Sequence, residues 1–286
     1  MIKIAICQLR TEIDRDETMA KAKRMVYEAA ENGADFAVLP EMFNCPYSRE
    51  YFKQYATLGH EDAVAAMSAW AKELGIYIVG GSVPETADGK IYNTCFVFDR
   101  EGKQIARHRK VHLFDVELPT LRVRESSTFS PGQDITVFET EYGTMGCAVC
   151  FDLRFPELFR TMQQRGAKVV FLPAQFSTTT GPKYWEAMIK ARAFDYQLYM
   201  VGAGAARYVG FNYEAYGHSV IVDPSGGIMC RAGEAEEIVY ADIDMDFLEN
   251  YRAQLPIMKL MRRDVYRISE LVVVHEVLVL FKCALI

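Results

Sequence analysis

Short apolar runs alternate along the chain with segments whose apolar positions recur every three or four residues. Residues 2–9 form a β-branched apolar run, which predicts a buried strand. Residues 16–32 have helical apolar spacing and are followed by Gly33, which predicts a helix that ends there. The other elements predicted in the first half are strands at 35–40, 76–83, 91–99 and 103–109, a helix at 61–74 closed by Gly75, and a tight turn at 99–102.

The second half of the chain repeats the plan of the first. GADFAVLPE at 33–41 corresponds to GAKVVFLPA at 166–174, and IYIVGGSV at 76–83 corresponds to LYMVGAGA at 198–205. TCFVFDREGKQIAR at 94–107 corresponds to HSVIVDPSGGIMCR at 218–231, and the second copy has a strand at 144–149 with helices at 156–165 and 184–194. This internal duplication predicts two sheets related by a pseudo-twofold axis with helices outside, which is a four-layer α-β-β-α sandwich of the α/β class.

Three chemically reactive side chains follow predicted strands. Glu41 closes the strand at 35–40, Lys110 closes the strand at 103–109, and Cys150 closes the strand at 144–149. Their counterparts in the other copy are Ala174, Arg231 and Gln8, so each reactive type occurs once. Because sites in α/β sheets form beyond the carboxyl ends of strands, we expect one composite site.

A thiol, a carboxylate and an ammonium together suit nucleophilic catalysis. The Cys150 thiolate is the predicted nucleophile, and Glu41 removes its proton and later returns it to the leaving group. Lys110 stabilises the negative charge that develops on the substrate oxygen, and the backbone N–H of Phe151 completes an oxyanion hole. Taken singly, such residues are more often a turn carboxylate, a surface lysine and a core cysteine, so their common placement at strand ends is what favours the functional interpretation.

Other uses of the cysteines remain open at this point. Cys147 and Cys150 form a C-x-x-C pair, which is one form of thiol redox site. Both are predicted to lie mostly within a strand, where residues three apart face opposite sides, so we expect that they do not pair. A zinc site lacks a second cysteine pair or a suitable histidine pair, and no P-loop or dinucleotide-binding motif is present in the sequence. A thiol-redox protein or a non-catalytic binding protein is the alternative of another class.

Composition narrows the class of protein. The chain has 286 residues, of which 50% are hydrophobic and 24% charged, with a formal net charge of -6. These values are typical of a globular protein and unsuited to binding nucleic acid. The sequence shows no signal peptide and no apolar segment of about 20 residues, so we expect a cytoplasmic protein that does not span a membrane. The odd number of cysteines, seven, favours free thiols.

Three motifs resemble those of the nitrilase superfamily of carbon–nitrogen hydrolases: LPEMFN around Glu41, RHRKVHLFD around Lys110 and GCAVCFDLRFPEL around Cys150. The resemblance implies the α-β-β-α sandwich over residues 1–267, assembly as a homodimer or larger oligomer, and a catalytic triad of Glu41, Lys110 and Cys150. It also implies that Glu125 positions Lys110 and the substrate, and that neither a metal nor an organic cofactor takes part. The apolar segment at 268–286 is left as a tail of unknown role.

Within this superfamily the chain is most similar to the ω-amidase branch, through KVHLFDVELP, ESSTFSPG and FSTTTGPKYWE. The resemblance implies hydrolysis of the terminal carboxamide of a small substrate that carries a carboxylate, such as α-ketoglutaramate, through a thioester. Arg154 is the predicted contact for that carboxylate, unless it braces the Cys150 loop through Glu157. The remaining predicted pocket residues are Tyr47, Phe176, Thr178, Thr179 and Thr180. Deaminated-glutathione amidase, N-carbamoyl amino acid hydrolase and nitrilase activities are alternatives on the same triad.

Overall fold

The computed structural model describes residues 1–211 and 213–266. The predicted tail at 268–286 and the last residue of the predicted hydrolase domain, 267, lie outside the described residues. The division of the chain into these two parts therefore stays a prediction.

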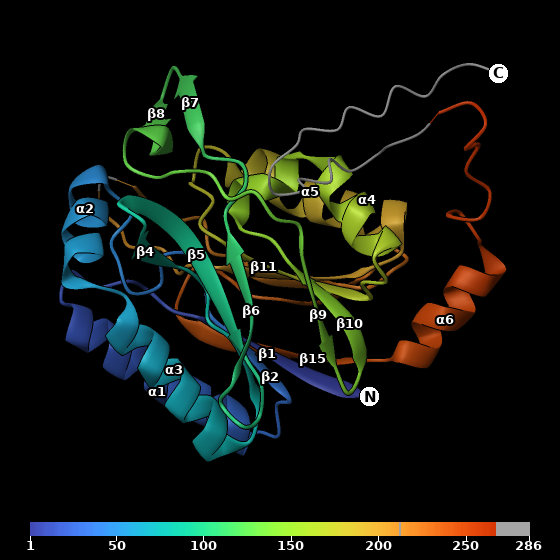
Figure 1. Cartoon of the computed structure of the whole chain (residues 1–286), viewed down its shortest axis with the longest axis horizontal. Coiled ribbons are helices and arrows are strands. Elements are labelled where there is room, and N and C mark those ends of the chain that lie inside the picture. The colour runs from blue at the N-terminus through green and yellow to red at the C-terminus, as the bar shows by residue number, and fades with distance from the viewer. Residues whose placement is uncertain (212, 267–286) are drawn as a thin grey trace.

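Two large sheets form the centre of the described structure (Figure 1). The first has the order β15-β1-β2-β3-β5-β4, with β6 also paired to β5, and the second has the order β14-β13-β12-β11-β10-β9. The strands of the first sheet are β1 (Ile2–Gln8), β2 (Phe36–Val38), β3 (Tyr77–Val79), β4 (Val83–Ala87), β5 (Lys90–Phe98), β6 (Gln104–Arg109) and β15 (Glu237–Ile243). Those of the second are β9 (Thr136–Thr140), β10 (Gly143–Cys147), β11 (Val169–Ala174), β12 (Tyr199–Gly204), β13 (Val220–Val222) and β14 (Ile228–Arg231).

Helices cover the outer faces of both sheets. The helices are α1 (Arg15–Glu31), α2 (Arg49–Leu58), α3 (Glu61–Leu74), α4 (Pro156–Gln164), α5 (Gly181–Tyr196) and α6 (Met245–Gln254). Figure 1 shows α1 and α3 on one side of the molecule and α4 and α5 on the opposite side. The prediction of an α-β-β-α sandwich is therefore confirmed.

The alternation of side chains along the strands builds two apolar layers. In β1, Ile4 and Ile6 belong to the core between the sheets, whereas Ala5 and Cys7 pack toward α1 and α3. Phe36 of the first sheet stacks on Phe171 of the second, with ring centroids 5.3 Å apart. Because successive side chains of a strand point to opposite faces, strands buried on both faces appear as continuous apolar runs in the sequence.

The two halves of the chain share one topology, as predicted, but exchange their last strands. β1, β2 and β3 are parallel, as are β10, β11 and β12, and each set continues into antiparallel strands. β9, the last strand of the first half, pairs with β10, and β15, the last strand of the second half, pairs with β1. Each sheet is therefore completed by a strand from the other half, which ties the halves together.

Local signals set several element ends, and those at Gly75 and at the turn 99–102 were expected. The Asp14 side chain accepts hydrogen bonds from the first-turn N–H groups of Asp16 and Glu17, which caps α1. Gly75 ends α3 in the left-handed conformation with φ +64°. The turn at 99–102 is confirmed by the hydrogen bond from Gly102 N to Asp99 O.

Other elements differ from the expectation or were not predicted. The strand predicted at 144–149 ends at Cys147, so Cys150 does not close a strand: it begins a short 3-10 helix, Cys150–Arg154. Some elements were not predicted from the sequence. Among them are α2, α6, β4, β15 and the small hairpin of β7 (Asp115–Leu118) and β8 (Leu121–Arg124).

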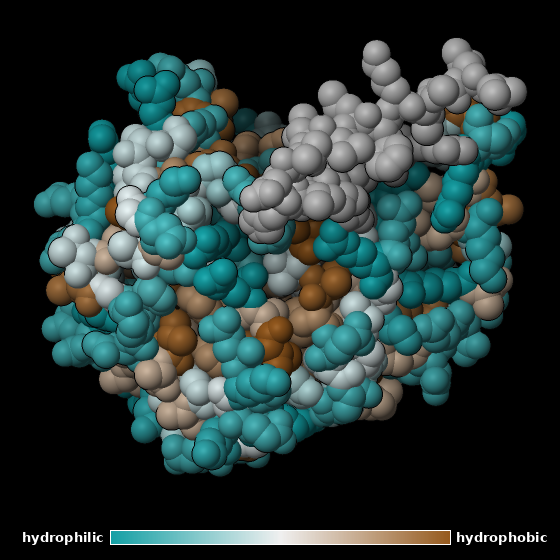
Figure 2. Space-filling model, viewed as in Figure 1, coloured by the Kyte–Doolittle hydropathy of each residue, from teal (hydrophilic) through white to brown (hydrophobic). Residues whose placement is uncertain are grey.

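The coloured part of the face in Figure 2 is largely hydrophilic, with hydrophobic residues in small separated groups. Several large apolar side chains of the C-terminal part are exposed, among them Phe247, Leu260 and Val265. Over the residues described, no helix is both long and apolar enough to cross a membrane.

Candidate active site

Glu41 follows β2 in a turn that its neighbours hold closely. The backbone N–H of Met42, the residue after Glu41, donates a hydrogen bond to Ser82 Oγ at 2.9 Å. A Cβ atom on Gly81 would lie 2.1 Å from the Pro40 carbonyl oxygen, so only glycine permits this approach. The Glu41 side chain is fully buried, and Asn93 donates a hydrogen bond to its Oε1 at 2.8 Å.

Lys110 follows β6 and points its ammonium at two carboxylates. Nζ lies 2.9 Å from Glu41 Oε1 and 2.9 Å from Glu125 Oε2. Burial lowers the pKa of Lys110, but the negative charges of Glu125 and Glu41 outweigh this and raise the pKa above its ordinary value. Lys110 is therefore protonated at neutral pH, although its side chain is shielded from solvent.

Cys150 occupies the first position of the 3-10 helix with φ +45° and is 5% exposed. Its thiol lies beside the Glu41 carboxylate and the backbone of Gln175. Burial and the Glu41 charge raise the pKa of the Cys150 thiol, against the opposite effect of Lys110. Burial likewise raises the pKa of Glu41, although Lys110 lowers it. At neutral pH the thiol therefore keeps its proton, with a carboxylate of raised basicity next to it.

Glu125 lies in a 3-10 turn (Glu125–Ser127) and is as buried as Lys110. Tyr47 donates its hydroxyl hydrogen bond to Glu125 Oε1 at 2.6 Å, and Phe114 N donates to Oε2 at 2.7 Å. Glu125 has its remaining contact with Lys110. It therefore holds the ammonium together with Glu41.

A small hollow opens next to the Cys150 thiol. Its lining residues are Phe114, Cys150, Phe151, Arg154, Phe176, Thr180 and Tyr213. Phe151, Arg154, Phe176 and Thr180 thus lie where the sequence placed the substrate. Arg154 stacks its guanidinium 4.0 Å over the ring centroid of Tyr184.

Three other predicted pocket residues lie elsewhere. Thr178 and Thr179 are half-exposed and are not part of the lining. Tyr47 lines a neighbouring hollow, together with Glu125 and Tyr213, and is connected to the Cys150 site through its contacts with these two residues.

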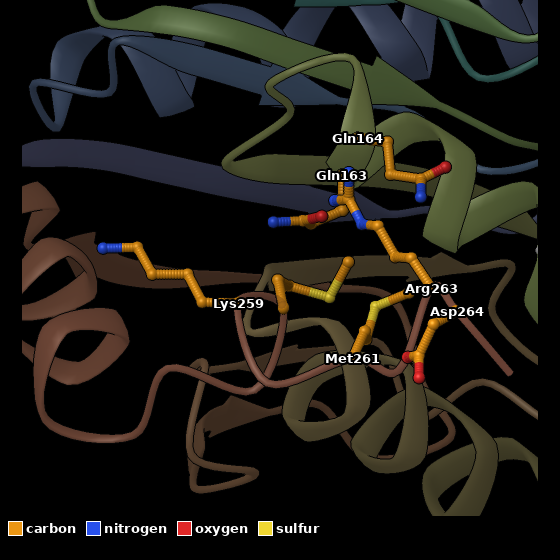
Figure 3. Close-up of a pocket in the computed structure, with 7 residues that line it drawn as sticks. Gln163, Gln164, Lys259, Met261, Arg263 and Asp264 are labelled. Carbon is orange, nitrogen blue, oxygen red and sulfur yellow. The ribbon is translucent and has the colours of Figure 1, made fainter.

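A larger hollow than the one at Cys150 lies away from this chemistry. It has about 1220 Å³ of empty space and is bounded by α4 and the segment after α6 (Figure 3). Its lining includes Gln163, Lys259 and Asp264, and none of the predicted site residues belongs to it. Size is therefore a poor guide here, and the smaller hollow at Cys150 is the candidate active site.

Sequence reasoning missed Phe114, Asn93 and Tyr213. Tyr213 is buried, donates a hydrogen bond to Gln175 O at 2.6 Å and stacks near Tyr47, with ring centroids 4.4 Å apart. It comes from the long segment between β12 and β13, which carries no periodic pattern. Phe114 lies within the RHRKVHLFD motif, so the motif could have pointed to it.

Gln8 is the residue that the sequence comparison of the two halves matched to Cys150, but the strand registers match it to Val149, one residue earlier. Its Oε1 accepts from Ser219 N and Oγ, and its Nε2 donates to the carbonyls of Gly233 and Ala235. This fully bonded amide holds the chain instead of facing a cavity. Gln8 is therefore a structural residue.

Cys147 and Cys150 do not form a disulfide. Both are free thiols, and Cys147 contacts Cys95 in the core between the sheets. Among residues 1–211 and 213–266 no three His, Cys, Asp or Glu side chains are grouped as a metal site needs. The expectation of no metal or cofactor stays a prediction.

Comparison with known proteins places these residues in context. The sequence profile described as carbon-nitrogen hydrolase matches residues 3–253. The omega-amidase NIT2 of Xenopus tropicalis is 41% identical over 269 residues, which cover 94% of this chain and 98% of that protein. The omega-amidase NIT2 of Mus musculus is 42% identical over 268 residues, which cover 93% and 97%.

Solved structures show the same fold. Saccharomyces cerevisiae Nit3, a member of branch 10 of the nitrilase superfamily, superposes with a TM-score of 0.84 at 37% identity, covering 92% of this chain and 96% of that one. The α-β-β-α sandwich and its relation to the nitrilase superfamily therefore rest on sequence and structure alike.

Proposed function

Because this chain belongs to the carbon–nitrogen hydrolase family, we propose that it hydrolyses the terminal carboxamide of a small carboxylate-bearing substrate, with Cys150 as nucleophile. The chain is an ω-amidase-like hydrolase of carbon–nitrogen bonds other than peptide bonds. The identity of the substrate and the roles of the residues are the parts proposed here. α-Ketoglutaramate, which would yield α-ketoglutarate and ammonia, is the proposed substrate.

One observation carries the proposal: a thiol, a carboxylate and an ammonium from three distant parts of the sequence meet in one buried place. Lys110 Nζ is 2.9 Å from Glu41, and the Cys150 thiol lies against the same carboxylate. Burying two such charges is unfavourable unless they are paired, and a thiol contributes little to that pairing. Catalysis accounts for all three groups being present.

The first half of the reaction forms a thioester. Glu41 takes the proton from the Cys150 thiol as Sγ attacks the amide carbon, which gives a tetrahedral intermediate with a negative oxygen. Lys110 and the Phe151 N–H stabilise that oxygen. The carbon–nitrogen bond then breaks, Glu41 returns its proton to the nitrogen, and ammonia leaves.

The second half consumes water. Glu41 removes a proton from the water molecule as the water oxygen attacks the thioester carbon. The carbon–sulfur bond breaks, the thiolate takes the proton back from Glu41, and the carboxylic acid product leaves. The raised pKa of Glu41 suits a group that gains and loses a proton in each half-reaction.

Glu125 and Arg154 set the position of the reacting groups. Glu125 holds the Lys110 ammonium, and is itself held by Tyr47 and Phe114 N. Arg154, on the lining of the Cys150 hollow, is the proposed partner of the distant substrate carboxylate, to which a guanidinium can donate two parallel hydrogen bonds. Phe176 and Thr180 complete the proposed pocket.

A panel of substrates tests the proposal. Ammonia release is measured with α-ketoglutaramate, deaminated glutathione, an N-carbamoyl amino acid and a nitrile, for the wild type and for Cys150→Ala. We expect the highest kcat/KM for α-ketoglutaramate, and no ammonia above background from a folded Cys150→Ala variant. A preference for another member of the panel would refute the substrate, and turnover by Cys150→Ala would refute the mechanism.

A further inference from the structure

Asp152 is a fully buried carboxylate for which the chemistry above has no use. Its Oδ2 accepts hydrogen bonds from Val149 N at 2.9 Å and from His108 Nε2 at 3.0 Å. Its Oδ1 accepts from His112 N at 2.9 Å and from His112 Nδ1 at 2.7 Å. Both oxygens are thus fully used, and hydrogen bonds from His108 and His112 outweigh the effect of burial and lower the pKa of Asp152.

Three of these hydrogen bonds, those from His108 and His112, join the two segments that carry the reacting groups, and the fourth closes the turn at Cys150. His108 and His112 lie two residues before and two residues after Lys110. Val149 directly precedes Cys150, and Asp152 lies two residues after it. The Asp152 carboxylate therefore accepts hydrogen bonds from residues on both sides of Lys110 and from the turn that carries the Cys150 thiol.

The turn at Cys150 itself depends on the hydrogen bonds of Asp152. Asp152 N donates to Val149 O at 3.0 Å, while the Asp152 side chain accepts from Val149 N, so the two residues are bonded in both directions. Between them Cys150 has φ +45°, a conformation that costs a non-glycine residue about 1–2 kcal/mol. Such a conformation persists only where surrounding contacts enforce it.

His108 extends the connection to the second sheet. Its ring is fully buried, with Nδ1 2.9 Å from Thr136 Oγ1 of β9 and Nε2 on Asp152. His112 is stacked on Phe155, with centroids 3.6 Å apart and planes 9° from parallel. Both rings are therefore immobilised, and neither reaches the hollow beside Cys150.

We propose that Asp152 is a positioning residue, which with His108 sets the separation between the Cys150 thiol and the Lys110 ammonium. This inference rests on the proposed roles of Cys150 and Lys110. An asparagine at position 152 keeps the shape of the side chain but replaces one carboxylate oxygen by an NH2 group. In either orientation of the amide, this NH2 group faces N–H donors that the carboxylate had accepted from, so donor meets donor. That mismatch shifts the two segments apart, and displacements of about 1 Å in an active site cost about 100-fold in rate.

Steady-state ammonia release separates positioning from a general structural role. For Asp152→Asn we expect kcat to fall tenfold or more and KM to change less than kcat, because the contact of Arg154 with Tyr184 of α5 helps to hold the distant end of the pocket. The matched control is Asp35→Asn, which alters a carboxylate bonded by Lys3 N, Arg100 Nη2 and Tyr142 Oη at the opposite end of β2. It should lower the melting temperature and leave kcat within twofold.

A second pair of variants keeps the test decisive if Asp152→Asn does not fold. His108→Gln retains an N–H donor for Asp152 and an acceptor for Thr136, whereas His108→Leu retains neither. We expect His108→Gln to keep most of kcat and His108→Leu to lose at least tenfold, each with KM little changed.

The outcomes separate this inference from the proposed function. A wild-type kcat in folded Asp152→Asn, or equal loss in both His108 variants, overturns the positioning role while Cys150→Ala remains inactive. Equal losses of kcat in Asp152→Asn and Asp35→Asn also overturn it, since they would follow stability alone. Ammonia release by Cys150→Ala would overturn the proposed function and this inference together.

Discussion

Lys110 Nζ lies 2.9 Å from Glu41 Oε1, and both side chains are completely shielded from solvent. With Glu125 on the other side, the resting site holds two carboxylates and one ammonium. In the proposed mechanism Glu41 becomes neutral when it takes the thiol proton, and the substrate oxygen gains the negative charge in the same stage. The net charge of the buried site therefore stays constant, so the intermediate needs no additional desolvated charge.

This exchange predicts the effect of Glu41→Gln. Glutamine keeps the side-chain size but cannot accept or return the thiol proton. We expect ammonia release to fall by at least about 100-fold, the lower limit for loss of general acid–base catalysis. Iodoacetamide should still reach the Cys150 thiol in this variant, and a kcat near that of the wild type would rule Glu41 out as the proton carrier.

Lys110→Met should destabilise the protein in a pH-dependent way. It leaves Glu41 and Glu125 buried without their cation, and breaking a buried pair costs about 3–5 kcal/mol. The pKa of Glu41, which Lys110 lowers in the wild type, then rises further in the folded state, so stability is retained at low pH and lost as the pH rises through the new folded pKa. Urea unfolding should therefore show a smaller deficit relative to the wild type at pH 5 than at pH 8.

Lys21→Met is the matched control for that variant. Lys21 is also buried and also faces two carboxylates, Glu12 and Glu236, away from Cys150. It should destabilise the protein and leave ammonia release near the wild-type rate. An identical loss of activity in both variants would contradict the role proposed for Lys110.

Much of this site could be predicted because its residues obey a simple topological rule. Lys110 directly follows β6, Glu41 lies three residues after the end of β2, and the duplicated sequence showed which copy carries each reactive type. Strand ends of the same sheet meet at one edge, so position in the sequence translates into position in space. The order of layers followed from the same alternation of apolar runs and amphipathic helices.

The features that were missed have no comparable local signal. The apolar run that holds Cys147 continues through Cys150, so hydrophobicity did not mark the end of β10 or the φ of +45° at Cys150. The exchange of β9 and β15 between the halves depends on long-range pairing. Tyr213 reaches the site from a segment without periodicity, and only the folded chain brings it beside Tyr47.

Tyr47→Phe tests the support of Glu125. It removes a hydrogen bond to a carboxylate, which is worth about 1.5–3 kcal/mol. Tyr55→Phe is the control, since Tyr55 donates to the neutral carbonyl of Ile13 at 2.8 Å and its loss should cost about 0.5–1.5 kcal/mol. Chemical denaturation should show the larger loss for Tyr47→Phe, together with a lower kcat for that variant alone.

The pH dependence of Cys150 alkylation follows from the raised pKa of its thiol. Burial and the Glu41 charge keep the proton on sulfur at neutral pH, and the thiolate is the form that reacts. Below the pKa the thiolate fraction rises about tenfold per pH unit, so the iodoacetamide rate should climb steadily from pH 7 to pH 9. Cys150→Ala measures the background from the other thiols, and a rate that is level over this range would mean that the thiolate already prevails at neutral pH.

Gly81→Ala tests whether the tight approach of the chain at Gly81 determines the position of Glu41. An added Cβ would lie 2.1 Å from the Pro40 carbonyl oxygen, at a φ of +56°. Gly89→Ala is the control, because Gly89 has a φ of +71° and no atom within 4 Å of the added Cβ, so it costs only the backbone strain of about 1–2 kcal/mol. Gly81→Ala should lose clearly more stability than Gly89→Ala, and it alone should reduce kcat, since Pro40 must move and Glu41 moves with it. Equal stabilities and equal rates for the two variants would show that the Pro40–Gly81 contact does not hold the carboxylate in place.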